Sequence, residues 1–108
     1  MKNEFVAVYI TAPNQKDAQK LAQLLLKERL VGCVNIVPYI ESLYRWGEKI
    51  ENHSEALLIV KTRSVLMKDL VKFVKKHHSY KVPCINALPI LEGNPDYLKW
   101  LKEETKKS

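Results

Sequence analysis

The hydrophobic pattern of the chain predicts an α+β fold with the order strand, helix, strand, strand, helix, strand, followed by a C-terminal helix. Three observations support this order: four segments rich in β-branched and aromatic residues, three segments with apolar residues at helical spacing, and turn or capping residues between them. The first six elements match the split βαβ arrangement, so the predicted fold class is a ferredoxin-like βαββαβ subunit with a long β-hairpin. Right-handed crossovers then place strands one and three in the centre of the sheet and strands two and four at its edges.

The first half of the chain supplies a central strand, a helix and an edge strand. Residues 5–10 are apolar at both odd and even positions, so we expect a strand buried on both faces. Asn14 is expected to cap an amphipathic helix that ends before Gly32. Residues 33–46 read as a strand, and Pro38 within it predicts an edge position with a bulge, because proline cannot donate a ladder hydrogen bond.

The second half returns through the hairpin and repeats the helix and strand. Residues 49–61 are expected to form strand three. Ser64 is expected to cap a second helix that ends near His78, and residues 84–91 form the last strand. Asn94 and the proline after it open the C-terminal helix.

Length and composition indicate a single domain over residues 1–108. The longest apolar runs are far shorter than the roughly 20 residues of a membrane span, and the N-terminal residues do not read as a signal peptide, so we expect a cytoplasmic protein. Cys33 and Cys84 fall at opposite ends and opposite edges of the predicted sheet, so both are expected to stay thiols. The net charge of +6 suits an acidic partner or a lysine-rich solvated surface equally.

The first hairpin arm is too long for the domain that carries it. Residues 33–45 could extend roughly 40 Å at about 3.3 Å per residue, whereas strand one offers only about eight residues as a partner. The arm should therefore overhang, and its apolar side chains in water favour pairing with another chain. The alternative is that Pro38 folds the arm back over its own sheet.

The stretch "KKHHSYKVPC" places His77 and His78 at the end of the second helix and Cys84 at the start of the last strand. These positions share one end of the predicted fold, and imidazole and thiolate are suitable ligands for copper or zinc. His77, His78 and Cys84 are therefore the candidate metal ligands. The alternative is structural, because histidines at a helix C-terminus favour the helix dipole by about 0.3 to 1 kcal/mol.

Several segments, in order and with compatible spacing, resemble the CutA family of divalent-cation tolerance proteins. They are "GCVNIVP", "SLYRWGEKIE", "LLIVKTR", "HHSYKVPCINALPI" and "GNPDYLKW". The resemblance covers nearly the whole chain. It implies a ferredoxin-like subunit in a homotrimer similar to that of the PII signalling proteins, with hairpin arms pairing between subunits and copper or another divalent cation as the associated ligand.

The resemblance at the candidate metal site is uneven. Four residues match the family pattern: His77, His78, Tyr80 and Pro83. Three depart from it, namely Ser79 in place of a proline, Lys81 in place of an acidic or amide residue, and Cys84 in place of a glutamate. The departures remove negative charge near a cation, although a thiolate at Cys84 suits copper as well as a carboxylate does. Tyr44, Trp46 and Lys61 also match the family as interface or cleft residues, with packing the competing role.

Two other classes of function share this element order. RNA-recognition domains need stacking aromatic residues on the central strands, and the aliphatic run at residues 56–60 offers none, so we expect no nucleic-acid partner. A PII-like signalling trimer that binds a small anionic ligand remains open. No Ser-His-Asp order, glycine-rich phosphate loop or convergent carboxylate pair is apparent in the sequence, so no enzymatic activity is expected.

Overall fold

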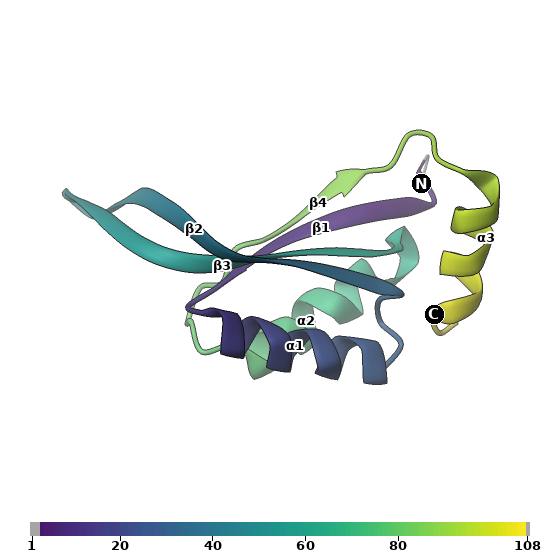
Figure 1. The fold of residues 1–108 in the computed structure, drawn as a ribbon, viewed down its shortest axis with the longest axis horizontal. Coiled ribbons are helices and arrows are strands. Elements are labelled where there is room, and N and C mark those ends of the chain that lie inside the picture. Colours follow the sequence, from purple (N-terminus) through teal and green to yellow (C-terminus); the bar gives the residue numbers. More distant parts are fainter. Residues whose placement is uncertain (1–2, 108) are drawn as a thin grey trace.

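The computed structural model describes residues 3–107 and shows a four-stranded antiparallel sheet with three α-helices (Figure 1). The elements are β1 (Phe5–Ala12), α1 (Gln15–Lys27), β2 (Cys33–Trp46), β3 (Lys49–Arg63), the 3₁₀ turn η1 (Ser64–Leu66), α2 (Met67–His77), β4 (Ile85–Pro89) and α3 (Pro95–Glu104). The strand order β2-β3-β1-β4 confirms the predicted ferredoxin-like arrangement, with β1 and β3 central.

Two of the three predicted helix N-caps are confirmed. The side chain of Asn14 accepts a hydrogen bond from the backbone N–H of Asp17 at 2.8 Å, and Asn94 likewise accepts from Asp96 at 3.0 Å. The predicted cap at Ser64 was wrong, because its hydroxyl donates to a backbone carbonyl near the N-terminus and a 3₁₀ turn precedes α2. The bulge expected at Pro38 is present as a register shift between Val37 and Ile40.

One face of the sheet packs on α1 and α2, which lie together beneath it (Figure 1). Val8 and Leu58 from the central strands and Leu25 and Leu70 from the two helices are fully buried there. The core therefore sits between the sheet and the helix layer.

The opposite face of the sheet is largely open in the single chain. Tyr9 is 38% exposed, and Leu88, which pairs with Ala7 on the same face, is 57% exposed. We predicted β1 to be buried on both faces, and this was wrong for the Tyr9 face, because α3 is the only described element near it and lies at one end of the sheet (Figure 1). An apolar sheet face in contact with water is unfavourable, so we expect another element or another chain to cover it.

A close apolar contact and two arginines, Arg29 and Arg63, hold α3 and the residues directly after it. Leu101 is fully buried, and a Cβ atom built on Gly32 would lie 2.6 Å from its Cδ1 atom. Arg29 donates to the backbone carbonyls of Glu103 at 2.9 Å and Glu104 at 3.1 Å. These carbonyls belong to the last turn of α3, where partners within the helix are missing.

The hairpin arm overhangs as predicted. β1 pairs with β3 only from Ala56 to Arg63, whereas β2 and β3 continue to pair with each other out to Trp46 and Lys49 (Figure 1). The molecule is consequently elongated, with extents of 44 × 26 × 22 Å. The arm does not fold back over its own sheet, and Ile50 near its tip is 68% exposed.

Among residues 3–107, none of the helices has both the length and the hydropathy needed to cross a bilayer.

Candidate functional site

The two predicted histidine ligands point to different neighbours. α2 ends at His77, and the backbone of His78 is already extended while its N–H still caps the carbonyl of Val74 at 2.8 Å. His77 is exposed and lies against Phe73 one turn earlier, with 4.3 Å between ring centroids. The His78 ring instead lies against Tyr80, at 4.8 Å. Both side chains nevertheless line one small pocket beside α1, together with Asp17.

Both ring nitrogens of His78 are occupied by protein partners. Nδ1 accepts a hydrogen bond from the backbone N–H of Tyr80 at 3.0 Å. Nε2 lies 2.7 Å from the backbone carbonyl oxygen of Thr11, which can only accept, so Nε2 carries the ring proton. A metal ion would need the Nδ1 lone pair and would have to displace the Tyr80 N–H.

Cys84 does not join the histidines in a preformed site. Its Sγ accepts from Asn86 at 3.4 Å, and it lies just before β4, at the sheet edge opposite the one where Cys33 begins β2. Both cysteines are free thiols. Within residues 3–107, no three His, Cys, Asp or Glu side chains are grouped as a metal site would require.

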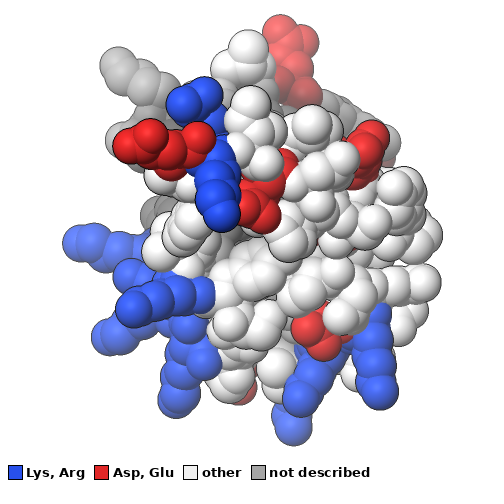
Figure 2. Space-filling model, turned by 90° about the vertical axis from the view of Figure 1, so that its left-hand side faces the viewer, with Lys and Arg blue, Asp and Glu red and all other residues white. Residues whose placement is uncertain are grey.

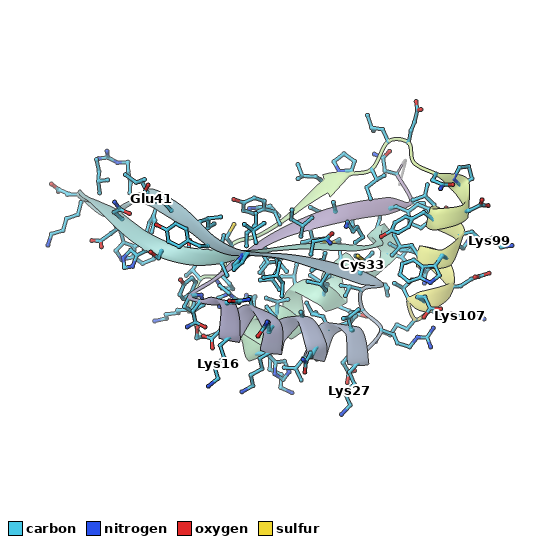
Figure 3. The ribbon with its side chains drawn as sticks, viewed as in Figure 1. Lys16, Lys27, Cys33, Glu41, Lys99 and Lys107 are labelled. Atoms are coloured by element: carbon cyan, nitrogen blue, oxygen red, sulfur yellow. The ribbon has the colours of Figure 1, made fainter. Side chains whose placement is uncertain are left out.

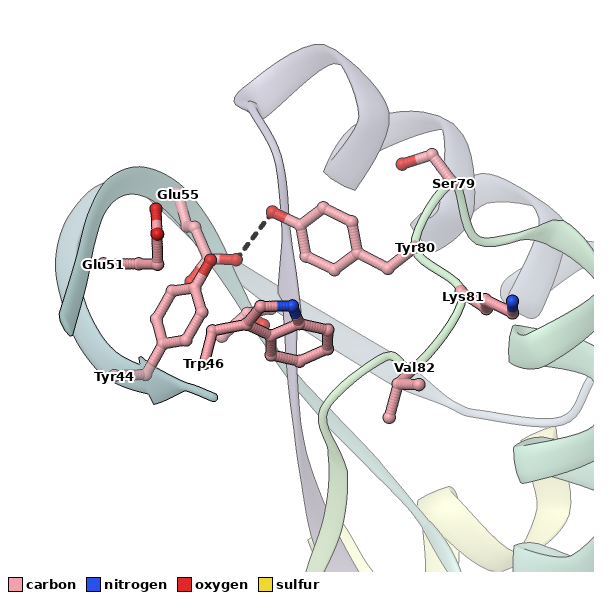
Figure 4. A pocket seen from close by; sticks show the side chains of 9 residues that line it. Tyr44, Trp46, Glu51, Glu55, Ser79, Tyr80, Lys81 and Val82 are labelled. Carbon is pink, nitrogen blue, oxygen red and sulfur yellow. Dashed lines mark hydrogen bonds between the residues drawn. The ribbon is translucent and has the colours of Figure 1, made fainter. Parts of the chain in front are cut away.

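A pocket lies between the hairpin arm and the loop after α2 (Figure 4). Its volume is about 650 Å³. The lining residues are Thr11, Tyr44, Trp46, Glu51, Glu55, Ser79, Tyr80, Lys81 and Val82. The sequence resemblance identified Tyr44 and Trp46 as cleft candidates, and both line this pocket.

Sequence reasoning missed Glu51 and Glu55. They are four residues apart on β3, and side chains at even spacing lie on the same face of a strand. This spacing is visible in the sequence and could have identified the pair. The third cleft candidate, Lys61, lies elsewhere, because its ammonium group contacts Cys33 at 3.7 Å and the side-chain carbonyl of Asn35. Lys61 is therefore not part of the pocket.

One hydrogen bond joins the two walls of the pocket. The Tyr80 hydroxyl donates to Oε2 of Glu55 at 2.7 Å (Figure 4), and Glu55 is only 8% exposed. Burial first, and then the bond to the Glu55 carboxylate, raise the pKa of Tyr80 well above its usual value of 10.0. Tyr80 thus remains a neutral donor throughout the physiological range.

The basic residues gather on the helix layer. Seen from the hairpin end, Figure 2 shows lysine and arginine side chains mainly on the side of α1 and α2. The four lysines of α2 are all exposed: Lys68, Lys72, Lys75 and Lys76. Most of the acidic side chains in this view lie in its upper half, away from the basic ones below.

Comparison with known proteins decides the family. The family model described as "CutA1 divalent ion tolerance protein" matches residues 6–104. The chain belongs to the CutA1 family. The sequence resemblance is thus confirmed, and with it a relation to divalent-cation tolerance.

Related CutA proteins and solved CutA1 structures are similar along most of the chain. Protein CutA of Arabidopsis thaliana is 48% identical over 101 residues, which are 94% of this chain and 56% of that protein. The CutA protein of Thermus thermophilus is 48% identical over 98 residues, 91% of this chain and 95% of that protein. The chain therefore spans little more than half of the plant protein, which is named as chloroplastic, and nearly all of the Thermus protein.

Two solved structures support the fold directly. CutA1 from Oryza sativa has a TM-score of 0.95 and 46% identity, and the match covers 99% of this chain and 98% of that one. The Thermus thermophilus protein has a TM-score of 0.92 and 46% identity, with 94% and 99% covered.

For this CutA-family chain, raising the pH above 10 is expected to lower the free energy of unfolding. Burial, followed by the Cys33 thiol, raises the pKa of Tyr97 to about 12, and the pKa of Tyr80 is also raised. The folded state then holds protons that the unfolded state releases, so this stabilisation is complete below pH 10 and declines as pH rises toward 12. Urea unfolding between pH 9 and 11.5 measures the slope.

The Tyr80→Phe, Tyr97→Phe double variant should lose less stability over the same pH interval. Tyr39→Phe, which removes an exposed hydroxyl on the hairpin arm, is the matched control and should keep the parent's slope. Equal slopes for the parent and the double variant would contradict this assignment.

Proposed function

We propose that this CutA-family chain is a cytoplasmic, non-enzymatic divalent-cation tolerance protein that works as a homotrimer. The observation that carries the proposal is the hairpin arm, which extends beyond the sheet and exposes Leu43 and Ile50 on one of its faces. Large apolar side chains gathered on an exposed strand pair favour association with another chain. The number three follows from the resemblance to PII-like trimers.

The edges of the strands support the same proposal. Within the described residues, 49–55 of β3 pair with β2 on one side, and no strand pairs with them on the other. The open face around Tyr9 and Leu88 lies on the same sheet. A neighbouring subunit that paired with a free edge and covered this face would bury both, and cyclic symmetry would close the assembly.

Light scattering behind a sizing column tests the assembly. We expect about three times the subunit mass of 12.5 kDa at micromolar concentration. A mass of one subunit would refute the proposal.

We also propose weak binding of divalent copper at the end of α2, with His77, His78 and Cys84 as ligands. The exposed imidazole of His77 can bind without rearrangement, whereas His78 must first release the Tyr80 N–H. Leaving that group without its partner costs about 1 to 3 kcal/mol if it stays buried, which lowers affinity. Copper forms the strongest complexes among the divalent first-row ions at nitrogen ligands, so it is the metal we expect here.

Calorimetric titration with copper is expected to show binding that disappears in a His77→Ala, His78→Ala double variant. Affinity should also fall as pH drops through about 6.5, because imidazole must lose its proton to bind metal. His53→Ala removes an exposed imidazole of the hairpin arm and is the matched control. Unchanged copper affinity in the double variant would refute this site.

Nucleic acid is not among the proposed partners. The exposed lysines of α2 offer phosphate contacts without a stacking surface, so any binding should be sequence-blind and should weaken steeply with salt. Selective binding to one sequence at physiological salt would contradict this view.

A further inference from the structure

The pocket between the hairpin arm and the loop after α2 contains none of the proposed copper ligands. Its volume of about 650 Å³ falls in the range of small-molecule sites and is far larger than a metal ion requires. Two different chemistries meet in its walls, aromatic rings and carboxylates.

The aromatic wall comes from both sides. Tyr44 and Trp46 project from β2 with ring centroids 6.5 Å apart and an interplanar angle of 88°, and Tyr80 faces them from the loop (Figure 4). Trp46 is 65% exposed, so packing within the chain does not account for it. Rings that meet at right angles present a face and an edge to the same space.

The carboxylates make this space acidic. Glu55 is largely buried, and Oε2 is the oxygen that accepts from Tyr80. No buried side-chain oxygen or nitrogen among the described residues lacks a partner, so the second oxygen of Glu55 is reached by solvent from the pocket that it lines. Glu51 adds a second carboxylate, with one oxygen 3.3 Å from His53.

The charge balance of the lining is negative. Lys81 is the one lysine or arginine among the described lining residues, and its side chain extends away from Glu51 and Glu55 (Figure 4). An anionic ligand would face two carboxylates in a partly desolvated site, which is unfavourable. The lining therefore disfavours the small anion that a PII-like signalling role would require.

We propose that this pocket binds a small organic cation that carries a methylated ammonium group. Such a cation gains from the faces of Trp46 and the two tyrosines by cation–π attraction and from Glu55 by charge. A methylated ammonium is weakly hydrated, so it enters an aromatic site more readily than a metal ion. None of the proposed copper ligands lines the site, although His78 holds the backbone of Tyr80 behind it.

Choline and its neutral isostere 3,3-dimethylbutan-1-ol are the probes, because they differ in one nitrogen for one carbon. Titration of the protein in its solution assembly, followed by calorimetry, should show choline binding at least about tenfold more tightly than the alcohol. In a Trp100→Phe background, choline should change the fluorescence of Trp46, the remaining tryptophan. Equal affinity for the two probes would overturn the proposal.

Substitutions in the pocket lining distinguish the contribution of the carboxylate charge to choline affinity from that of the aromatic ring. Glu55→Gln keeps an acceptor for Tyr80 and removes the charge, so choline affinity should fall about tenfold. Trp46→Leu should weaken binding by about fivefold or more. Glu92→Gln removes an exposed carboxylate of the loop before α3 and is the matched control, which should bind as the parent does. An unchanged affinity in Glu55→Gln would refute the assignment.

Two further measurements exclude other occupants. The His77→Ala variant removes a copper ligand and leaves the contacts between His78 and Tyr80 intact, so it should bind choline as the parent does, and failure of the copper site and failure of this pocket give different results. Acrylamide should quench Trp46 in the ligand-free assembly, and choline should protect it. If Trp46 is already shielded without ligand, a second copy of the chain fills the pocket and the proposal is wrong.

Discussion

Replacing Leu43 and Ile50 by aspartate is expected to convert the assembly into single subunits of 12.5 kDa. The pairings of Leu43 with Asn52 and of Ile50 with Arg45 put both side chains on one face of the arm, opposite the face that carries Tyr44 and Glu51. Burial of each side chain between subunits would contribute about 1.5 to 3 kcal/mol. An aspartate there reverses that gain and adds the cost of desolvating a charge.

The subunit itself should stay folded, because both positions are largely exposed in the single chain. Light scattering measures the mass, and circular dichroism checks the fold. Leu26→Asp with Val65→Asp adds the same charge at exposed apolar positions on the helix side of the fold and should keep the parent's mass. A trimer that survives the arm substitutions would show that the arm does not hold subunits together.

Truncation of Leu101 to alanine is expected to lower the free energy of unfolding by about 2 to 5 kcal/mol. Leu101 is the fully buried side chain of α3. A Cβ atom built on Gly32 would lie only 2.6 Å from the Cδ1 atom of Leu101. Gly32→Ala should therefore also destabilise, by about 1 to 3 kcal/mol, because it overfills the same contact.

The double variant distinguishes this contact from two independent defects. With Leu101 shortened, the new methyl group at Gly32 has space, so the combined loss should be smaller than the sum by about 0.5 to 3 kcal/mol. Urea unfolding gives all three values. Gly93→Ala is the control, since its Cβ would meet Leu98 at 3.4 Å, an ordinary contact. Strict additivity would contradict the proposed packing.

Local signals in the sequence were sufficient for the strand order and for much of the secondary structure. Asn14 and Asn94 bond to backbone groups two or three residues away, so their capping roles are visible in a short window. Pro38 marks the bulge because its missing N–H acts at its own position. The overhang followed from comparing strand lengths.

Features that depend on partners far away in the sequence could not be predicted from local patterns. Ser64 bonds to a carbonyl sixty-one residues away instead of capping α2. The apolar pattern of β1 says that both faces avoid water, but it cannot say whether a helix of the same chain or a neighbouring subunit covers the Tyr9 face. The partner that Glu55 finds in Tyr80 likewise depends on how the loop after α2 returns to the sheet.

His78 shows how a histidine can be needed without a metal. The ring of His78 accepts a hydrogen bond from the backbone N–H of Tyr80 and donates one to the backbone carbonyl of Thr11, at the end of β1. The backbone N–H of His78 donates to the carbonyl of Val74 at the C-terminus of α2. The imidazole is thus a rigid spacer, because its flat ring fixes the angle between the acceptor Nδ1 and the donor Nε2. Asparagine offers the same two functions from a smaller group and could not span this gap. The aromatic ring of Tyr80 stays in place, facing the hairpin, because a neighbour of fixed width braces the loop behind it.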